Sequence, residues 1–168
     1  MPQAVLIGPP GAGKSTVGKA LARSIGVGFL DSDSVVEKNA DKRISDIFVD
    51  EGEEVFRELE YEALKACLLD SNCILALGGG APISDRAQSL LMESGAPVVF
   101  LDVSLSIAGP RVGFNRDRPL LLGNPRAQWQ ALYDVRRPVY EKLATITVKV
   151  DFVKLNDIVT EIRSGLII

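Results

Sequence analysis

Gly8-Pro9-Pro10-Gly11-Ala12-Gly13-Lys14-Ser15 matches the phosphate-binding pattern GxxxxGK[ST] at every defined position. A short apolar run at residues 4–7 precedes this stretch, and apolar residues recur with helical spacing over residues 14–25. Glycines in such a loop let backbone N–H groups turn toward phosphate oxygens, and the helix N-terminus adds a positive partial charge. Lys14 then reaches the β- and γ-phosphates, and the Ser15 hydroxyl can ligate Mg²⁺. The alternative is a glycine-rich turn that precedes Lys-Ser by chance, and the flanking strand and helix count against it.

Histidine is absent from the 168 residues. Ser-His-Asp triads, Cys-His pairs and HExxH zinc sites are therefore excluded. Acid–base chemistry must use carboxylates, Lys, Tyr or Cys. The chain has 19 Lys+Arg and 22 Asp+Glu, and its net charge of −3 gives no electrostatic reason for broad nucleic-acid binding.

The length and the apolar pattern predict a single domain over residues 1–168. The N-terminus has neither a basic leader nor a cleavage site, and no apolar run approaches the ~18 residues of a membrane span. We therefore expect a cytoplasmic protein without a membrane partner, and a monomer because nothing in the sequence demands an oligomer. Cys67 and Cys73 lie in apolar stretches and are expected to be reduced core residues, with a redox pair as the alternative.

Strand and helix patterns alternate along the chain. Strands are predicted at residues 4–7, 27–30, 73–77, 97–103 and 145–150, and helices at 14–25, from about 34, 44–51, 53–70, 85–94, 127–143 and 156–163. Pro138 is expected to interrupt the helix over 127–143, and Gly109-Pro110 to interrupt a helical run before Arg111. The alternation predicts an α/β fold with an open, mostly parallel five-stranded sheet. Residues 112–126 lose the periodicity and have the length of a lid segment.

Two polar groups follow predicted strands, at the edge of a parallel sheet where ligands bind. Asp31 and Asp33 follow the second strand, and both point to the same side if the chain stays extended. One carboxylate could hold a Mg²⁺-bound water while the other accepts a hydrogen bond from an attacking hydroxyl, or either could simply cap the next helix. Gly78, Gly79 and Gly80 follow the third strand, where their backbone can contact a substrate closely or form an ordinary turn.

Arginines form the third polar group: Arg57, Arg111, Arg116, Arg118 and Arg136. Arg57 could bind a carboxylate with its forked guanidinium, although, taken alone, a surface pair with Glu53 or Tyr61 at helical spacing explains it better. Arg118, in the lid-like stretch, could meet the charge that develops on a transferring phosphoryl group. Arg136 could equally be a solvated helix charge. Since no Asn-Lys-x-Asp segment for reading guanine occurs, the residues indicate a small anion-binding kinase, with a non-catalytic nucleotide sensor as the competing class.

Five further stretches resemble the shikimate kinase family in order and approximate spacing. They are LeuAspSerAsp (30–33), PheArgGluLeuGlu (56–60), LeuGlyGlyGly (77–80), ArgProLeuLeu (118–121) and ArgArgProValTyr (136–140). The resemblance covers nearly the whole chain. It implies a three-layer α/β/α P-loop NTPase fold, with substrate-binding helices at about 34–60 and a lid at about 112–126. It also implies phosphoryl transfer from ATP, with Mg²⁺, to the 3-hydroxyl of shikimate, on the route to aromatic amino acids.

The same resemblance assigns roles to individual residues. Nucleotide binding is assigned to Gly11, Ala12, Gly13, Lys14, Ser15, Thr16, Arg111 and Arg118, and shikimate binding to Asp33, Arg57, Gly78, Gly79, Gly80 and Arg136. Asp33, Lys14 and Arg118 would be catalytic, with Asp33 as base or orienter. Ser15 and Asp31 would hold the metal, Asp31 through water. Pro10, Ile44, Phe48 and Phe56 would supply apolar walls, with helix-core packing as the equal alternative for the last three.

The sequence departs from the family pattern at Gly109-Pro110, at the additional Arg116 beside Arg118, and at residues 151–156. That last segment is shorter than the usual adenine-side loop, so no adenine contacts are assigned to it. A gluconate kinase of the same superfamily is the alternative enzyme, because gluconate is also a carboxylate. A catalytically inactive nucleotide-binding regulator is the alternative outside enzymes, although such a protein would be expected to have lost Lys14, Asp33 or Arg118.

Overall fold

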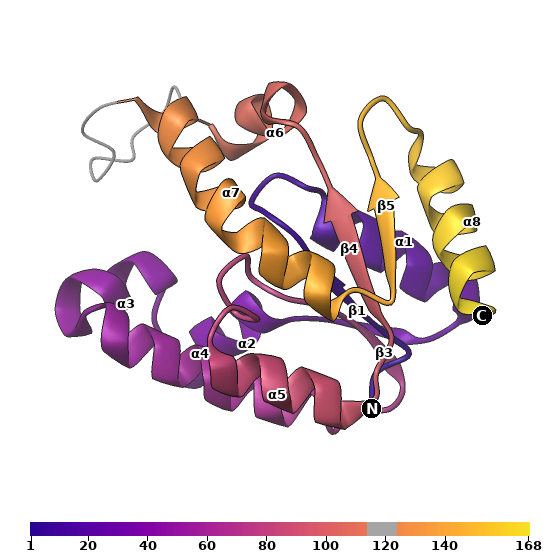
Figure 1. Ribbon diagram of the computed structural model, residues 1–168. Helices are drawn as coiled ribbons and strands as arrows, with labels where there is room; N and C mark the ends of the chain where they lie inside the picture. The colour runs from indigo at the N-terminus through magenta and orange to yellow at the C-terminus, as the bar shows by residue number, and fades with distance from the viewer. Residues whose placement is uncertain (114–123) are drawn as a thin grey trace.

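A five-stranded parallel sheet forms the centre of the protein (Figure 1). The computed structural model describes residues 1–113 and 124–168. The strands are β1 (Ala4–Ile7), β2 (Gly28–Asp31), β3 (Cys73–Ala76), β4 (Val98–Asp102) and β5 (Ile146–Lys149). They lie in the order β2-β3-β1-β4-β5, and every neighbouring pair is parallel. The predicted α/β fold with a mostly parallel sheet is confirmed.

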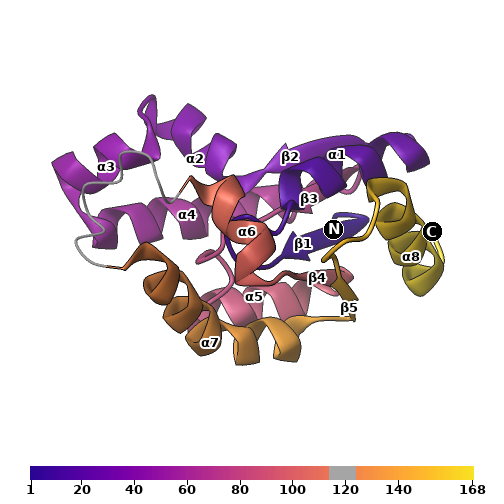
Figure 2. The same cartoon turned by 90° about the horizontal axis from the view of Figure 1, so that it is seen from above.

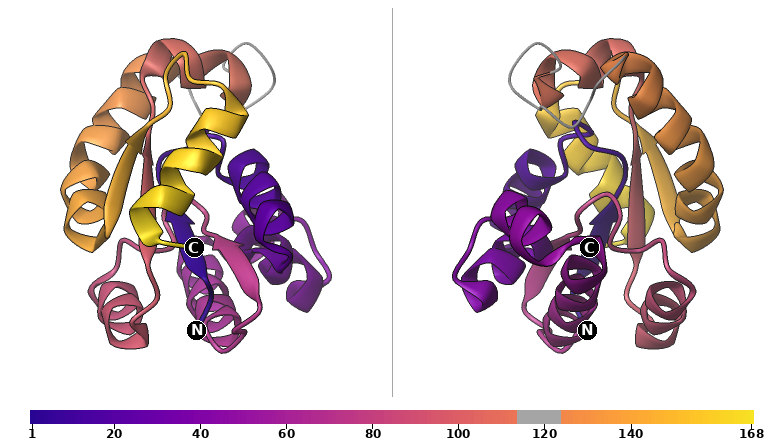
Figure 3. Two further views of the ribbon diagram at one scale, coloured as in Figure 1. Left: turned by 90° about the vertical axis from the view of Figure 1, so that its right-hand side faces the viewer. Right: turned by 90° about the vertical axis from the view of Figure 1, so that its left-hand side faces the viewer.

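Helices cover both faces of this sheet. They are α1 (Lys14–Ile25), α2 (Ser32–Ala40), α3 (Ile44–Glu51), α4 (Glu53–Cys67), α5 (Asp85–Ser94), α6 (Leu105–Val112), α7 (Pro125–Leu143) and α8 (Leu155–Leu166). Figure 2 shows α1 and α8 on one side of the sheet and α5 and α7 on the other. Figure 3, viewed from the right-hand and left-hand sides of Figure 1, shows α7 above α5 on the same side of the molecule in both views. The molecule therefore has the three α/β/α layers that the resemblance implies.

The main core lies between the sheet and both helix layers. All four residues of β1 and all four of β3 are buried, as strands covered on both faces must be. A second, smaller cluster of Val36, Ile47, Phe56 and Ala63 joins α2, α3 and α4. Cys67 and Cys73 are buried and unbridged, as expected.

Two predicted helix interruptions are wrong. Helix α6 continues through Pro110, and α7 continues through Pro138. A proline removes one N–H···O=C bond from a helix, here the bonds that would reach the carbonyls of Ser106 and Asp134. Both Asp134 and Pro138 are exposed on α7, so water can solvate the freed carbonyl, while buried Tyr133 and Tyr140 hold the helix against the sheet.

Helix boundaries elsewhere shift by a few residues. Helix α2 begins at Ser32, two residues before the predicted start, and α4 ends at Cys67, three residues before the predicted end. The predicted lid falls mainly on residues 114–123, so the lid, Arg116 and Arg118 lie outside the described residues. Within residues 1–113 and 124–168, no helix combines the length and apolar character that crossing a membrane requires.

Candidate active site

The phosphate loop connects β1 to α1. Gly11 and Gly13 have left-handed backbone conformations, with φ of 84° and 88°, which residues with a side chain rarely adopt. A Cβ on Gly11 would also lie 2.9 Å from the carbonyl oxygen of Ala108 on α6. The Lys14 ammonium donates to the Gly8 and Pro9 carbonyls at 2.7 and 3.0 Å, and its burial lowers the pKa of Lys14 to about 8. The loop thus holds one buried cation at the start of helix α1.

Ser15 and Asp31 meet at the carboxyl end of β2. The Ser15 hydroxyl donates to Asp31 Oδ2 at 2.8 Å, while Asp31 Oδ1 accepts from the backbone N–H groups of Asp33 and Ser34 at 2.9 and 3.4 Å. Asp31 is therefore the N-cap of α2 and also a partner of Ser15. One carboxylate oxygen caps the helix and the other faces Ser15, so capping does not prevent Asp31 from holding a metal-bound water. The chain turns into α2 directly after Asp31 and does not stay extended.

This pair fits a hard divalent cation. Both side chains offer oxygen atoms, which Mg²⁺ prefers, and Mg²⁺ usually takes one or two protein oxygens together with phosphate oxygens and water. Among the described residues, no group of three or more His, Cys, Asp or Glu side chains forms a complete cage for a metal. The donor set therefore suits a metal that arrives with a nucleotide better than a resident structural ion.

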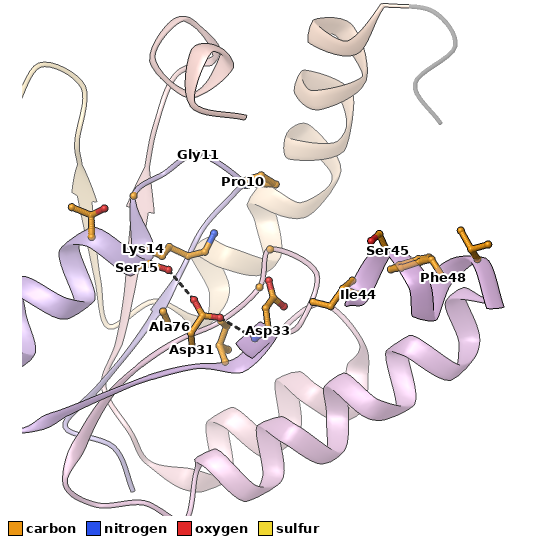
Figure 4. A pocket seen from close by; sticks show the side chains of 16 residues that line it. Pro10, Gly11, Lys14, Ser15, Asp31, Asp33, Ile44, Ser45, Phe48 and Ala76 are labelled. Atoms are coloured by element: carbon orange, nitrogen blue, oxygen red, sulfur yellow. Dashed lines mark hydrogen bonds between the residues drawn. The ribbon is translucent and has the colours of Figure 1, made fainter. Parts of the chain in front are cut away.

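Asp33 lies in the first turn of α2 and faces a cavity that Lys14, Ser15 and Asp31 also line (Figure 4). Burial, and then the neighbouring Asp31 carboxylate, raise the pKa of Asp33, while Lys14 and Arg57 act in the opposite direction. The cavity has a volume of about 1040 Å³, and Figure 4 shows Lys14, Ser15 and both aspartates on one wall. Its other wall comes from α3. That wall includes Ile44, Ser45, Phe48 and Val49.

Three consecutive glycines follow β3, and each lies against a different charged side chain. A Cβ on Gly78 would lie 2.5 Å from Asp33 Oδ1, and a Cβ on Gly79 would lie 3.3 Å from Arg136 Nη1. A Cβ on Gly80 would lie 2.9 Å from Arg57 Nη2. Residues from α2, α4 and α7 therefore converge on one short loop, which they can approach closely because its glycines have no side chains.

Arg57 is held by a buried carboxylate that sequence reasoning missed. Its Nη1 donates to Glu60 Oε1 at 2.8 Å, and the Glu60 side chain is only 5% exposed. Burial raises the pKa of Glu60, and the Arg57 charge opposes that rise. Glu53, the partner expected for a surface pair, lies 3.5 Å away and is 69% exposed. The i,i+3 spacing of Arg57 and Glu60 in PheArgGluLeuGlu was a signal that could have identified this pair.

Other residues of the site were also missed. The Ser32 hydroxyl accepts from the Gly78 N–H at 3.0 Å, and the Trp129 indole donates to the Pro10 carbonyl at 3.0 Å. Tyr140 donates to the Gly79 carbonyl at 2.6 Å. These contacts join the phosphate loop and the glycine loop to α2 and α7.

A second cavity, of about 270 Å³, also adjoins the phosphate loop. It is lined by Ala12, Gly13, Thr16, Val17, Arg111, Val150, Val153, Leu155 and Ile158. Arg111 donates to the Gly11 carbonyl at 3.1 Å, so α6 places this arginine beside the loop although Pro110 lies within the helix. Phe56, in contrast, packs in the small core cluster rather than in either cavity, with its ring tilted by 38° against that of Phe48 and the ring centroids 4.7 Å apart.

A family model of shikimate kinase matches residues 10–166. The chain belongs to the shikimate kinase family. The shikimate kinase of Thermobifida fusca is 51% identical over 147 residues, which cover 88% of this chain and 84% of the relative. The solved structure of shikimate kinase from Acinetobacter baumannii in complex with shikimate has a TM-score of 0.92 and 33% identity, over 99% of this chain and 93% of that one. As a shikimate kinase, the protein phosphorylates shikimate with ATP.

A gluconokinase from Sinorhizobium meliloti is also similar, with a TM-score of 0.60 and 22% identity over 99% of this chain and 91% of that one. This likeness shows a shared fold alone. The shikimate kinase relatives match this chain far more closely.

Proposed function

We propose that this site transfers the γ-phosphoryl group of MgATP to the 3-hydroxyl of shikimate, with the nucleotide on the phosphate loop and shikimate against the glycine loop. The observation that carries the proposal is that Gly78, Gly79 and Gly80 adjoin Asp33, Arg136 and Arg57 in turn. An acceptor lying along this loop meets a carboxylate at one end and two guanidinium groups at the other. Shikimate has hydroxyl groups opposite a carboxylate, which matches this order of charges.

The reaction needs one proton acceptor and several cations. The shikimate hydroxyl oxygen forms a bond to the γ-phosphorus as the bond to the bridging oxygen of ADP breaks, and the hydroxyl proton passes to Asp33. The raised pKa of Asp33 favours this transfer, although a loose transition state requires little basicity. Lys14 offsets charge on the β- and γ-phosphates. Arg118, which lies outside the described residues, has its role from the ArgProLeuLeu motif alone and would meet the transferring group.

Ser15, and Asp31 through water, would hold Mg²⁺. When bound, the ion neutralises phosphate charge and orients the nucleotide. The cavity that contains Arg111 would take the adenine base, against the apolar side chains of Val153 and Leu155. The monomeric state and a cytoplasmic location stay predictions.

A coupled assay of ADP release tests the acceptor. Shikimate, gluconate and a nucleoside monophosphate are offered in parallel at saturating ATP and Mg²⁺. We expect ADP release to be stimulated by shikimate only. Stimulation by gluconate alone would overturn the assignment, and nucleotide binding with no stimulation by any acceptor would favour the regulator alternative.

The variant Gly80→Ala tests whether the Arg57 guanidinium binds the acceptor. Gly80→Ala places a methyl group against the Arg57 guanidinium, which is the movable end of a flexible side chain. We expect a higher KM for shikimate, an unchanged KM for ATP and almost unchanged stability. An unchanged KM for shikimate would remove Arg57 from the acceptor site.

A further inference from the structure

The glycine loop contains a tight turn whose corner has no side chains. The Ala81 N–H donates to the Gly78 carbonyl at 3.0 Å, which closes a β-turn with Gly79 and Gly80 as its two central residues. Neither glycine has a positive φ, so the turn is not of type II, I′ or II′. Type I and type II turns differ by rotation of the central peptide, through changes of roughly 150° in one ψ and 170° in the next φ. Because glycine accepts positive φ easily, Gly79-Gly80 by itself favours neither orientation strongly.

A hydrogen bond from α7 selects one of these orientations. The Tyr140 hydroxyl donates to the Gly79 carbonyl at 2.6 Å, and Tyr140 is fully buried. Its ring packs on Phe100 of β4, with centroids 5.3 Å apart, so the hydroxyl has a fixed position relative to the sheet. Since the peptide unit is planar and trans, a carbonyl turned toward α7 directs the N–H of Gly80 away from α7.

The peptide that Tyr140 holds lies between the two arginines of the acceptor site. Arg136 precedes Tyr140 by one helical turn, and its Nη1 adjoins Gly79, while Arg57 adjoins Gly80. We propose that Tyr140 is a positioning residue, which holds the Gly79–Gly80 peptide so that the Gly80 N–H faces the acceptor as a hydrogen-bond donor. The proposal rests on the proposed placement of shikimate along the glycine loop.

Helix α7 supplies a matched control. Tyr133, seven residues before Tyr140 on the same helix, is also buried and donates its hydroxyl to Asp102. Asp102 keeps two further hydrogen bonds from Arg137, at 2.6 and 3.2 Å, when that hydroxyl is removed. Tyr133→Phe therefore removes an equivalent buried hydroxyl from the same helix without touching the glycine loop.

Kinetics provide the first test. A neutral hydrogen bond contributes about 0.5–1.5 kcal/mol, so Tyr140→Phe should raise the KM for shikimate about two- to twelvefold. The KM for ATP should stay within about twofold, and Tyr133→Phe should leave both constants unchanged. If Tyr140→Phe leaves the KM for shikimate unchanged, or if Tyr133→Phe raises it equally, the positioning role is overturned.

Selective ¹⁵N-glycine labelling provides a second test that needs no substrate. In the wild-type protein the Gly80 amide should give a single sharp signal without exchange broadening, and in Tyr140→Phe it should broaden or split as the peptide samples both orientations. Exchange of Gly80 in the wild-type protein would overturn the proposal even if the variant failed to fold. Broadening confined to Tyr140→Phe, in a protein that does not phosphorylate shikimate, would support peptide positioning while the proposed function fails.

Discussion

Replacing Glu60 by Gln removes a charge but keeps the side-chain shape and an oxygen acceptor. Glu60 is 5% exposed, and its carboxylate accepts from Arg57 at 2.8 Å. The substitution has two opposing consequences. It relieves the cost of keeping a carboxylate buried, and it weakens the bond that holds the Arg57 guanidinium beside Gly80.

The magnitude follows from the kind of bond that is lost. Hydrogen bonds to a charged group contribute about 1.5–3 kcal/mol, and the bond from Arg57 to Gln stays in this class because the guanidinium keeps its charge. Loss of the second charge moves the bond from the upper to the lower part of that range, so the guanidinium loses about 1 kcal/mol of orientation. If shikimate binding must supply all of this lost orientation free energy, the KM for shikimate rises about fivefold. The free energy of unfolding should change by less than about 1 kcal/mol, or about 2–4 °C in Tm, because relief of burial offsets the weaker bond.

Glu53→Gln is the control, because it removes a carboxylate from the same arginine at an exposed position. Glu53 is 69% exposed and lies 3.5 Å from Arg57, and exposed ion pairs contribute little. Its effect on the KM for shikimate should be below about twofold. Steady-state kinetics of both variants, with urea unfolding of each, check the prediction.

Two outcomes would refute this reasoning. If Glu60→Gln and Glu53→Gln raise the KM for shikimate equally, the buried contact has no special role. If Glu60→Gln changes the KM for ATP and not that for shikimate, Arg57 does not serve the acceptor.

Three other predictions concern the same site. The KM of the wild-type protein for shikimate should rise on acidification, because protonation of Glu60 deprives Arg57 of a charged partner. The midpoint of this rise should lie above the ordinary glutamate value of 4.5, because burial raises the pKa of Glu60. A pH series of Glu60→Gln should lack the rise. Asp33→Asn should lower kcat by about 10²–10⁴-fold with little change in nucleotide affinity, and a near-normal kcat in the coupled assay would exclude Asp33 from the chemistry. Arg136→Lys should raise the KM for shikimate without lowering Tm. Arg137→Lys should lower Tm and leave the KM for shikimate unchanged, because Arg137 donates two hydrogen bonds to the Asp102 carboxylate. The reverse pattern would contradict both assignments.

The pH dependence of stability has a defined sign for Glu60. Because the folded-state pKa is raised, the folded chain binds this proton more tightly than the unfolded chain does. The contribution to stability is therefore fully present below the unfolded pKa and is lost as the pH rises through the folded pKa. Urea unfolding of the wild-type protein and of Glu60→Gln across this range should converge at low pH.

Much of the fold could be predicted because its signals are local. Apolar runs, Gly26 and Ser84 at helix ends, and the phosphate-loop pattern each act over a few residues, and the structure has the corresponding strands and caps. The predicted breaks at Pro110 and Pro138 were wrong because tertiary packing outweighs the loss of one helical bond. Local signals also could not show that Asp31 both caps α2 and accepts a hydrogen bond from Ser15, because the second contact depends on how α1 lies beside the end of β2.

The sequence by itself determined the nucleotide loop, the alternation of strands and helices, and the exclusion of histidine chemistry. It also identified Asp33, Arg57, Arg136 and the three glycines as residues of interest. Only the tertiary structure decided that Trp129 bonds to Pro10, 119 residues away, and that Tyr140 bonds to Gly79, 61 residues away. Such pairs have no fixed spacing along a chain. They form because parallel strands bring successive loops to one edge, where α7 lies across them.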